Sequence, residues 1–352
     1  MTADTLRTIA QLRDAGFVPA AQTAALERIA ARYAVAITSA VADLIDRDDP
    51  NDPIARQFIP DPAELEPQPH ERADPIGDDT FSPVDGIVHR YPDRVLLKLV
   101  HTCPVYCRFC FRREMVGPGG RLGLTREKRD AAYRYIEQHP EIWEVILTGG
   151  DPLVLPASRL RSAVRALAAI DHVRIIRVHT RMPTVAPERV TAELVAALRA
   201  PGKTTFVALH ANHPRELSPP ARAACARIVD AGIPMLSQTV LLRGVNDDVE
   251  TLSALMRAFV ECRIKPYYLH HADLAPGTAH LRTSIKTGQH LISQMRGRLS
   301  GLCQPTYVLD IPGGAGKVPV GPSYINATSD GAEQRYEVRT INGDLHAYPP
   351  RK

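Results

Sequence analysis

An α/β fold, with parallel strands arranged as a partial barrel, is the architecture that this sequence predicts from three observations. The middle of the chain alternates short runs of β-branched and aliphatic residues with longer stretches of helical pattern. Strands joined by helices run parallel, with right-handed crossovers. The 352 residues also leave room for extensions, since α/β barrels occupy about 250 residues.

The first predicted element is a helical extension at the N-terminus. Between residues 1 and 46, apolar residues recur at steps of three and four, which predicts one apolar helical stripe. Its members are Leu26, Ile29, Tyr33, Ile37, Val41 and Leu44. Prolines and acidic residues crowd the next segment, 46–83, which predicts an irregular segment that wraps around the domain.

Six strands are predicted in the middle part of the chain. They cover 94–100, 143–150, 173–180, 204–210, 235–242 and 265–273. Ser218 before Pro219 predicts the start of one intervening helix, and Asp247 with Glu250 predicts a capping box at another. We expect an extension at 1–85, the barrel at 86–300 and a C-terminal segment at 301–352. The active site of such a barrel lies at the C-terminal ends of its strands.

Composition narrows the class of protein. The net charge of +4 arises from interspersed charges of both signs, so it does not favour nucleic-acid binding. The N-terminus carries charges throughout and no apolar run is long enough to span a bilayer, so we expect a cytoplasmic protein without membrane contact. Cys225, Cys262 and Cys303 are scattered, and we expect buried or unpaired thiols.

The other three cysteines form the most informative motif. Cys103, Cys107 and Cys110 lie directly after the first predicted strand. A structural zinc site takes four ligands and a four-iron cluster usually four cysteines, so three thiolates suggest a cluster with one iron open to an outside ligand. A zinc site with His101 as fourth ligand is the alternative. The spacing resembles that of radical S-adenosylmethionine (SAM) enzymes, in which SAM fills the open position. The neighbouring Arg108, Arg112 and Arg113 are expected to serve acidic ligands.

Two glycine-containing loops are further candidates. In "TGGDP", Gly149 and Gly150 let backbone approach a ligand, and Asp151 can accept from an ammonium; an ordinary strand-to-helix turn has the same residues. The loop "DIPGGAGK" leads to Lys317, but it lacks the first glycine and the hydroxyl residue of a P-loop. It could instead present the amine of Lys317 to an aldehyde such as pyridoxal phosphate (PLP), with a plain surface lysine as the alternative.

In combination these segments resemble the lysine 2,3-aminomutase family of PLP-dependent radical SAM enzymes. The resemblance runs from about residue 50 to the C-terminus through "DGIVHRYPDRVLL", "CPVYCRFCFRR", "LTGGDPL", "HANHP", "QTVLLRGVND", "PYYLHHADLAPGTAHLRT" and "SGLCQPTYVLDIPGGAGKVPV". It implies a radical SAM partial (β/α)6 barrel with an N-terminal helical extension and a C-terminal PLP-binding segment. It also implies an isomerase that interconverts L-lysine and L-β-lysine.

The resemblance implies a set of cofactors and the residues that hold them. A [4Fe-4S] cluster would be bound by Cys103, Cys107 and Cys110, and PLP would be joined covalently to Lys317. Arg90 and Arg94 match ligands of the PLP phosphate, for which guanidinium forks are suited, although two surface arginines at a strand start would look similar. Positions that match residues close to SAM are Gly149, Gly150, Asp151, His210 and Gln238. For the last two, a buried polar filling of the barrel is the alternative.

Substrate choice depends on three further matches. Arg112 matches the arginine that pairs with the substrate carboxylate. Asp273 and Asp310 match the pair that binds the distal ammonium of lysine, and a buried ammonium does need opposite charge. Either aspartate alone could be a cap or turn residue. A glutamate or arginine 2,3-aminomutase, the enzyme that makes β-lysine for elongation factor P, and a non-catalytic metal module remain as alternatives.

Departures from the family pattern complete the expectations. Relatives of the clostridial type carry a cysteine-rich zinc site, whereas this chain has Asp248 at one such position and ends in "DLHAYPPRK", so we predict no zinc. His270 replaces an aromatic residue near the cofactor. The expected partners are L-lysine, an electron donor such as flavodoxin or ferredoxin, and further copies of the chain in a homo-oligomer.

Overall fold

A nine-stranded sheet is the centre of the computed structural model, which describes residues 5–117, 123–330 and 333–349. The strands pair in sequence order, and all pairs from β2 to β8 are parallel. The parallel strands are β2 (Arg94–Val100), β3 (Glu144–Gly149), β4 (Ile175–Thr180), β5 (Thr204–His210), β6 (Met235–Leu241), β7 (Ile264–His271) and β8 (Thr306–Ile311). Antiparallel strands β1 (Ile87–Tyr91) and β9 (Gly316–Pro319) flank them.

Helices connect each parallel strand to the next, which confirms the predicted α/β partial barrel. They are α5 (Arg126–Glu137), α6 (Ala157–Ala168), α7 (Met182–Val185), α8 (Ala192–Ala197), α9 (Pro219–Asp230), α10 (Val249–Glu261) and α11 (Ile285–Met295). All six predicted strands are present. The sequence predicts the residues of β8 as part of a separate C-terminal segment, 301–352. The structure instead pairs β8 with β7 as a seventh parallel strand of the sheet.

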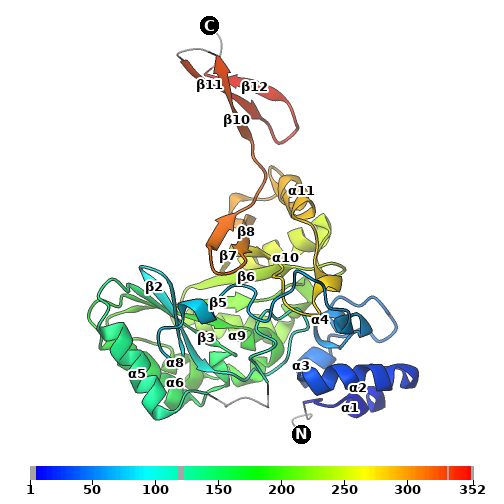
Figure 1. Ribbon diagram of the computed structural model, residues 1–352, viewed down its shortest axis with the longest axis vertical. Coiled ribbons are helices and arrows are strands. Elements are labelled where there is room, and N and C mark those ends of the chain that lie inside the picture. Colours follow the sequence, from blue (N-terminus) through cyan, green and yellow to red (C-terminus); the bar gives the residue numbers. More distant parts are fainter. Residues whose placement is uncertain (1–4, 118–122, 331–332, 350–352) are drawn as a thin grey trace.

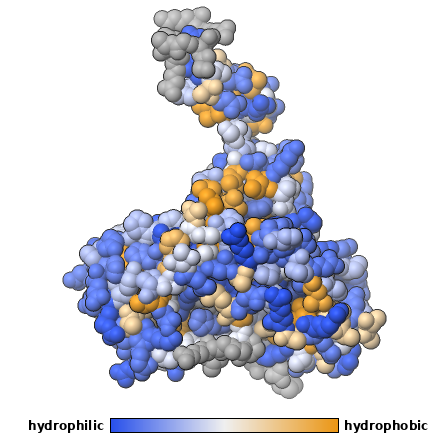
Figure 2. Space-filling model, in the orientation of Figure 1, coloured by the Kyte–Doolittle hydropathy of each residue, from blue (hydrophilic) through white to orange (hydrophobic). Residues whose placement is uncertain are grey.

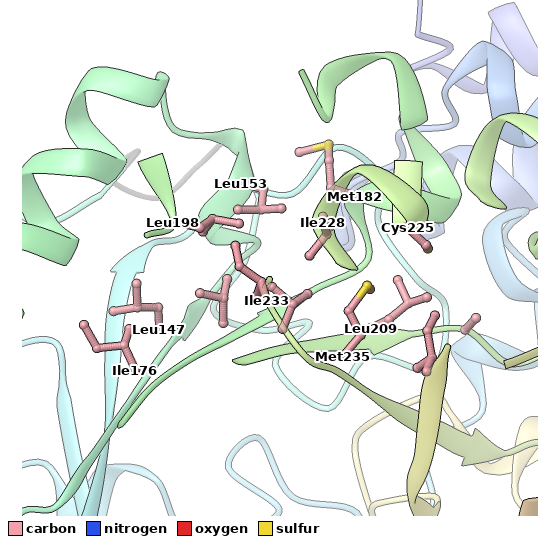
Figure 3. Close-up of a cluster of buried hydrophobic side chains, with 14 of the residues drawn as sticks. Leu147, Leu153, Ile176, Met182, Leu198, Leu209, Cys225, Ile228, Ile233 and Met235 are labelled. Atoms are coloured by element: carbon pink, nitrogen blue, oxygen red, sulfur yellow. The ribbon is translucent and has the colours of Figure 1, made fainter. Parts of the chain in front are cut away.

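The main hydrophobic core lies between the sheet and these outer helices (Figure 1). Leu147, Ile176 and Leu209 of the strands and Cys225 and Ile228 of α9 belong to one buried cluster, part of which Figure 3 shows. Each fully buried aliphatic side chain of this kind stabilises the fold by about 1.5–3 kcal/mol. This packing makes the strand ends a rigid platform for the loops that follow them.

One of the two predicted helix starts is correct and the other is displaced. Helix α9 begins at Pro219 after the N-cap Ser218, as predicted. The N-cap of α10 is Asp248, whose extended backbone lets its carboxylate accept from Thr251 N at 2.8 Å. The predicted cap, Asp247, instead accepts from Gly244 N in the preceding turn. The role that the structure shows for Asp248 is therefore to cap the N-terminus of α10.

The N-terminal extension is less regular than the predicted stripe. It consists of α1 (Ile9–Asp14), α2 (Thr23–Arg32), α3 (Ser39–Ala42) and α4 (Ala55–Phe58). A single helical stripe is wrong beyond Tyr33, since that residue ends α2 with extended backbone and Ile37 forms a β-bridge with Leu6. The apolar residues still converge, because the chain bends back and buries them with Phe58 and with Val105 of the cysteine loop.

The irregular segment and the C-terminal residues complete the molecule. Residues 46–83 run in short turns and pack Gly77 against the backbone of Gly313 and Gly314. A second, antiparallel sheet of β10 (Ile325–Asp330), β11 (Glu333–Arg339) and β12 (Leu345–Tyr348) extends from the end of the body near α11 (Figure 1), where Ile341 packs against Gly297. Apolar side chains are exposed on it (Figure 2), namely Ile325, Ile341, Leu345 and Tyr348. The last residues of "DLHAYPPRK", 350–352, lie outside the described part.

No helix within the described ranges is both long enough and apolar enough to cross a membrane. The three scattered cysteines, Cys225, Cys262 and Cys303, are buried and free, as expected.

Candidate active site

The cysteine loop follows β2 at the C-terminal edge of the sheet. Cys103, Cys107 and Cys110 are free and line one cavity together with Tyr33 and Ala34 of the extension. Burial raises the pKa of Cys103 well above its ordinary value and that of Cys110 to about 11. A bound cation would reverse this effect, because metals deprotonate coordinating thiols. Among the described residues, no three His, Cys, Asp or Glu side chains form a group ready for one metal ion.

Two buried arginines hold the cysteine loop from behind. Arg108 donates from Nε to Glu64 Oε1 at 2.9 Å, and Arg113 donates to the same carboxylate. All three side chains are almost fully buried, and Glu64 comes from the wrapping segment. The expectation that Arg108 and Arg113 serve an acidic ligand is therefore wrong, because the acid is supplied by the protein. Sequence gave no signal for Glu64, which lies more than forty residues away from both arginines.

A third arginine, Arg181, reaches the loop from the end of β4. It donates to Cys107 Sγ at 2.9 Å, to Gln57 Oε1 at 2.6 Å and to Glu216 Oε2 at 2.6 Å. Burial alone would lower the pKa of Arg181, but the charges of Cys107 and Glu216 raise it. Sequence reasoning missed this residue, although its place directly after a predicted strand was an available signal.

The "TGGDP" turn packs on the cysteine loop itself. A Cβ on Gly150 would lie 2.1 Å from Thr102 O, and one on Gly149, which has a positive φ, 2.2 Å from Val100 O. Both glycines thus allow backbone to approach backbone. Asp151 accepts from Thr180 Oγ1, Arg181 N and Leu153 N, and burial raises its pKa. The described contacts of the turn are therefore with the protein, and they fasten the loop to β3 and β4.

Polar side chains face the interior of the barrel beside the loop. His210 stacks on Phe109, which lies between two of the motif cysteines, with ring centroids 5.4 Å apart. Burial, together with the charge of Arg181, holds the pKa of His210 well below its ordinary value. Gln238 Nε2 lies 3.5 Å from His179 Nε2. His179 was not among the predicted residues. Of the residues expected close to SAM, the structure thus brings His210 to the cysteine loop and Gln238 beside His179.

Lys317 lies at the far end of the sheet, on β9 and directly opposite Asp310 on β8. Its Nζ donates to Asp310 and lies 3.3 Å from His270 Nδ1. Its backbone N donates to Tyr91 Oη at 2.7 Å. Burial alone would raise the pKa of Asp310, but His270 and Lys317 together lower it to about 2. The "DIPGGAGK" loop therefore turns Lys317 back over the site instead of leaving it on the surface.

Three further charged residues are coupled to this lysine: Lys317 and Arg112 both act on the charge of Asp273, and Arg90 shares Asp310 with Lys317. Burial, with the neighbouring charge of Asp310, raises the pKa of Asp273 to about 7. Arg112 donates from Nε and Nη2 to Asp78 Oδ2 at 3.0 and 2.8 Å. Arg90 reaches both Asp78, at 3.3 Å, and Asp310, at 3.9 Å. Asp78 was not predicted; it comes from the wrapping segment and links the two arginines.

Arg94 is attached to the same group less directly. It pairs with the adjacent Asp93 at 2.6 Å, its side chain is 34% exposed, and it lies over the ring of Tyr91. Tyr91 in turn accepts from Lys317 N. Arg90 is therefore connected to Lys317 through Asp310, and Arg94 through Tyr91.

The donor sets fit the expected cofactors. Three thiols on one loop around one cavity are the ligands of a cluster that binds its fourth partner elsewhere. Near Lys317, the buried atoms Arg90 Nε and His270 Nε2 have no hydrogen-bond partner within the described ranges. Both atoms are therefore available as donors to a ligand with acceptor oxygens.

Two parts of the chain match models of known protein families. Residues 97–255 match the model of the radical SAM superfamily, and residues 292–351 match a model described as lysine-2,3-aminomutase. L-lysine 2,3-aminomutase of Clostridium subterminale is 42% identical over 314 residues, which are 89% of this chain and 74% of that protein. The enzyme of the same name from Fusobacterium nucleatum is 40% identical, over 89% of this chain and 73% of that protein.

A relative with another substrate in its name also matches. Glutamate 2,3-aminomutase of Clostridioides difficile is 34% identical over 303 residues, which are 85% of this chain and 70% of that protein. Identity at this level over most of both partners, together with the two family matches, leads to one conclusion. The chain belongs to the lysine 2,3-aminomutase family, and it is a radical SAM isomerase.

Proposed function

We propose that this radical SAM aminomutase interconverts L-lysine and L-β-lysine. Its family uses a [4Fe-4S] cluster, SAM and PLP. The relatives include enzymes named for lysine and one named for glutamate, so the family alone leaves the substrate open. The observation that supports lysine is the pair Asp273 and Asp310, two carboxylates beside Lys317 in a pocket that also holds Arg112.

Charge is the argument for a cationic side chain. Burial and the charge of Asp310 raise the pKa of Asp273 to about 7, so the pocket would gain from another cation. The distal ammonium of lysine supplies that cation and three donors. The distal carboxylate of glutamate would add a third negative charge. Arginine would also bring a cation, but its fork is longer and planar.

Arg112 is the proposed partner of the substrate carboxylate. Asp78 holds its Nε and Nη2, while among the described residues Nη1 contacts only Thr148 Oγ1, at 3.4 Å. Nη1 is thus the donor left for a ligand, and Asp78 orients it. We place Arg112 at the α-carboxylate end and the two aspartates at the ammonium end of the substrate.

The cofactors would be held by the residues expected from the sequence. Cys103, Cys107 and Cys110 would bind three irons, and His210, Gln238 and the turn at Gly149, Gly150 and Asp151 would lie close to SAM. Lys317 would hold PLP through its amine, with Arg90 and Arg94 at the phosphate. When bound, the cluster with SAM supplies a carbon-centred radical, and PLP supplies a conjugated ring that stabilises the unpaired electron during migration of the amino group.

The chain itself positions groups and controls charge. Asp310 holds the Lys317 ammonium, Asp78 holds Arg112, and Arg181 donates to Cys107. Each contact fixes a reactive side chain before substrate arrives, which is how enzymes lower the entropic part of a barrier. We further propose that reduced flavodoxin or ferredoxin supplies the electron in the cytoplasm, and that the chain forms a homo-oligomer.

The test is an anaerobic assay of the reconstituted enzyme with L-lysine, L-glutamate and L-arginine in parallel. Chromatography of the products should show β-lysine and no comparable conversion of the other two. Conversion of glutamate or arginine at a higher kcat/KM than lysine would overturn the substrate assignment. Absence of SAM cleavage after full cluster loading would contradict the proposed roles of the cysteines.

A further inference from the structure

His270, on β7, has an unusual place beside Lys317. Its Nδ1 lies 3.3 Å from Lys317 Nζ and 3.6 Å from Asp310 Oδ2. The side chain is 16% exposed, and Nε2 is shielded from solvent without a hydrogen-bond partner among the described residues. One ring nitrogen is therefore engaged by the protein and the other is not.

The contacts determine which nitrogen carries the proton. The Lys317 ammonium has only donors, and its Nζ lies 3.3 Å from Nδ1, whereas Asp310 Oδ2 lies 3.6 Å away, beyond hydrogen-bond distance, so we assign Nδ1 as the acceptor of a hydrogen bond from Lys317. A neutral imidazole that accepts at Nδ1 carries its proton on Nε2. Burial and the charge of Lys317 lower the pKa of His270 more than Asp310 raises it, which favours this neutral ring. Nε2–H is then a buried donor that lacks an acceptor.

The surroundings indicate where that donor is directed. His270 lies close enough to His179 and His210 for its charge to lower their pKa values. Lys317 and Asp310 face it from β9 and β8, and Tyr268 lies beside it on its own strand, with the two rings edge to face. None of the described residues accepts from Nε2–H, so this donor is available to a ligand close to Lys317.

We propose that His270 positions Lys317 through Nδ1 and offers Nε2–H as a hydrogen-bond donor to the ring oxygen of the PLP that Lys317 would hold. The inference rests on the proposed function. PLP carries this oxygen next to the aldehyde carbon that reacts with a lysine, whereas its phosphate is assigned to Arg90 and Arg94. A donor on the oxygen withdraws negative charge from it, and the attached lysine nitrogen then holds its proton less tightly.

Three substitutions separate the two nitrogens. His270→Gln places an amide nitrogen near the position of Nε2. His270→Asn places an amide oxygen near the position of Nδ1 and so keeps an acceptor for Lys317, whereas His270→Leu removes both contacts. His290→Gln, on the exposed side of α11, is the matched control for the chemical change. The readout is the pH midpoint of the absorption change of bound PLP, measured without substrate. Borohydride reduction and peptide mapping show whether the cofactor is on Lys317.

His270→Leu and His270→Asn should raise the midpoint by about one pH unit, the effect of one hydrogen bond lost from one protonation state. His270→Gln and the control should keep the parent's midpoint. A parent-like midpoint in His270→Leu, with the label still on Lys317, would overturn the inference while leaving the proposed function intact. If Asn restores the midpoint and Gln does not, the contact to Lys317 alone matters and the donor role is wrong. A label on another lysine in the parent would refute the proposed function instead.

Discussion

The cysteine loop and the Lys317 pocket lie on the same sheet but differ in how their buried charges are paired. Around the loop each buried cation has a fixed partner: Arg108 and Arg113 share Glu64, and Arg181 pairs with Glu216. Around Lys317 the charges do not balance locally. Asp310 has a pKa of about 2, whereas Asp273, whose pKa the charge of Asp310 raises, has one of about 7.

This difference in charge pairing distinguishes residues that support the fold from residues that bind a ligand. A buried ion pair whose two charges neutralise each other has little charge left to offer a ligand, and its loss mainly costs stability. Groups whose pKa values are displaced by burial and by like charge are those that a ligand of the right charge can relieve. The charges that support the cysteine loop are therefore paired within the protein. The charges around Lys317 become balanced only when a ligand binds there.

The largest expected effect comes from breaking the support of the loop. Glu64→Gln would leave two buried guanidinium groups without a counter-charge and should lower the free energy of unfolding by about 3–5 kcal/mol. Urea denaturation measures the change. Glu261→Gln, which removes an exposed ion pair with Arg222, is the control and should cost less than about 1 kcal/mol. Equal losses in the two variants would contradict a supporting role for Glu64.

The second effect concerns the unbalanced pocket and depends on pH. The pKa of Asp273 rises from 3.8 to about 7 on folding, so the folded state keeps a proton that the unfolded state has lost between these values. Below about pH 4 the carboxyl is protonated in both states and does not lower the free energy of unfolding. The free energy of unfolding then falls as the pH rises to about 7, and this group lowers it no further at higher pH. At about 1.36 kcal/mol per unit, the loss reaches about 4 kcal/mol.

Asp273→Asn removes this dependence. The stability of the variant relative to the parent should increase steadily from pH 5 to 7 and then level off. Urea denaturation of both proteins at several pH values measures it. Parallel stability curves would show that the carboxyl titrates near its ordinary pKa and that the pocket is less unbalanced than we infer.

A smaller effect tests how tightly the glycine turn fastens the loop. In Gly150→Ala the new methyl would lie 2.1 Å from Thr102 O, so backbone must move, at a cost of about 1–3 kcal/mol. Gly301→Ala is the matched control, because nothing lies within 4 Å of its added Cβ. Thermal or urea unfolding compares the two. A Gly150→Ala protein as stable as the control would mean that the turn and the loop are not rigidly coupled.

The smallest expected effect distinguishes the two phosphate arginines. Arg90 is 10% exposed and reaches Asp78 and Asp310, whereas Arg94 is 34% exposed and pairs with its neighbour Asp93. A partly exposed guanidinium contributes about 1 kcal/mol or less, so Arg94→Ala should weaken PLP binding about fivefold at most. Arg90→Ala should weaken it considerably more. Equilibrium titration with PLP gives both values, and a larger loss in Arg94→Ala would reverse the assignment.

Several features of this protein were determined by sequence over short distances. The six predicted strands, the start of α9 at Pro219 and the three-cysteine motif follow from residue types and spacings within a few positions. Such local patterns act through backbone propensity, side-chain period and ligand chemistry, so they can be read before the chain is folded. The match of Lys317 to a PLP lysine is also a local inference, since it rests on the residues of one loop.

Only the tertiary structure decided which charges meet. Glu64 with Arg108, Asp78 with Arg112, and Arg181 with Cys107 join segments between 34 and 74 residues apart. No local pattern encodes such pairs, because their energy depends on the distance and burial that folding creates. For the same reason the expected acidic ligand of Arg108 and Arg113 proved to be Glu64. The opposite pKa shifts of Asp273 and Asp310 likewise arise only once β7, β8 and β9 lie side by side.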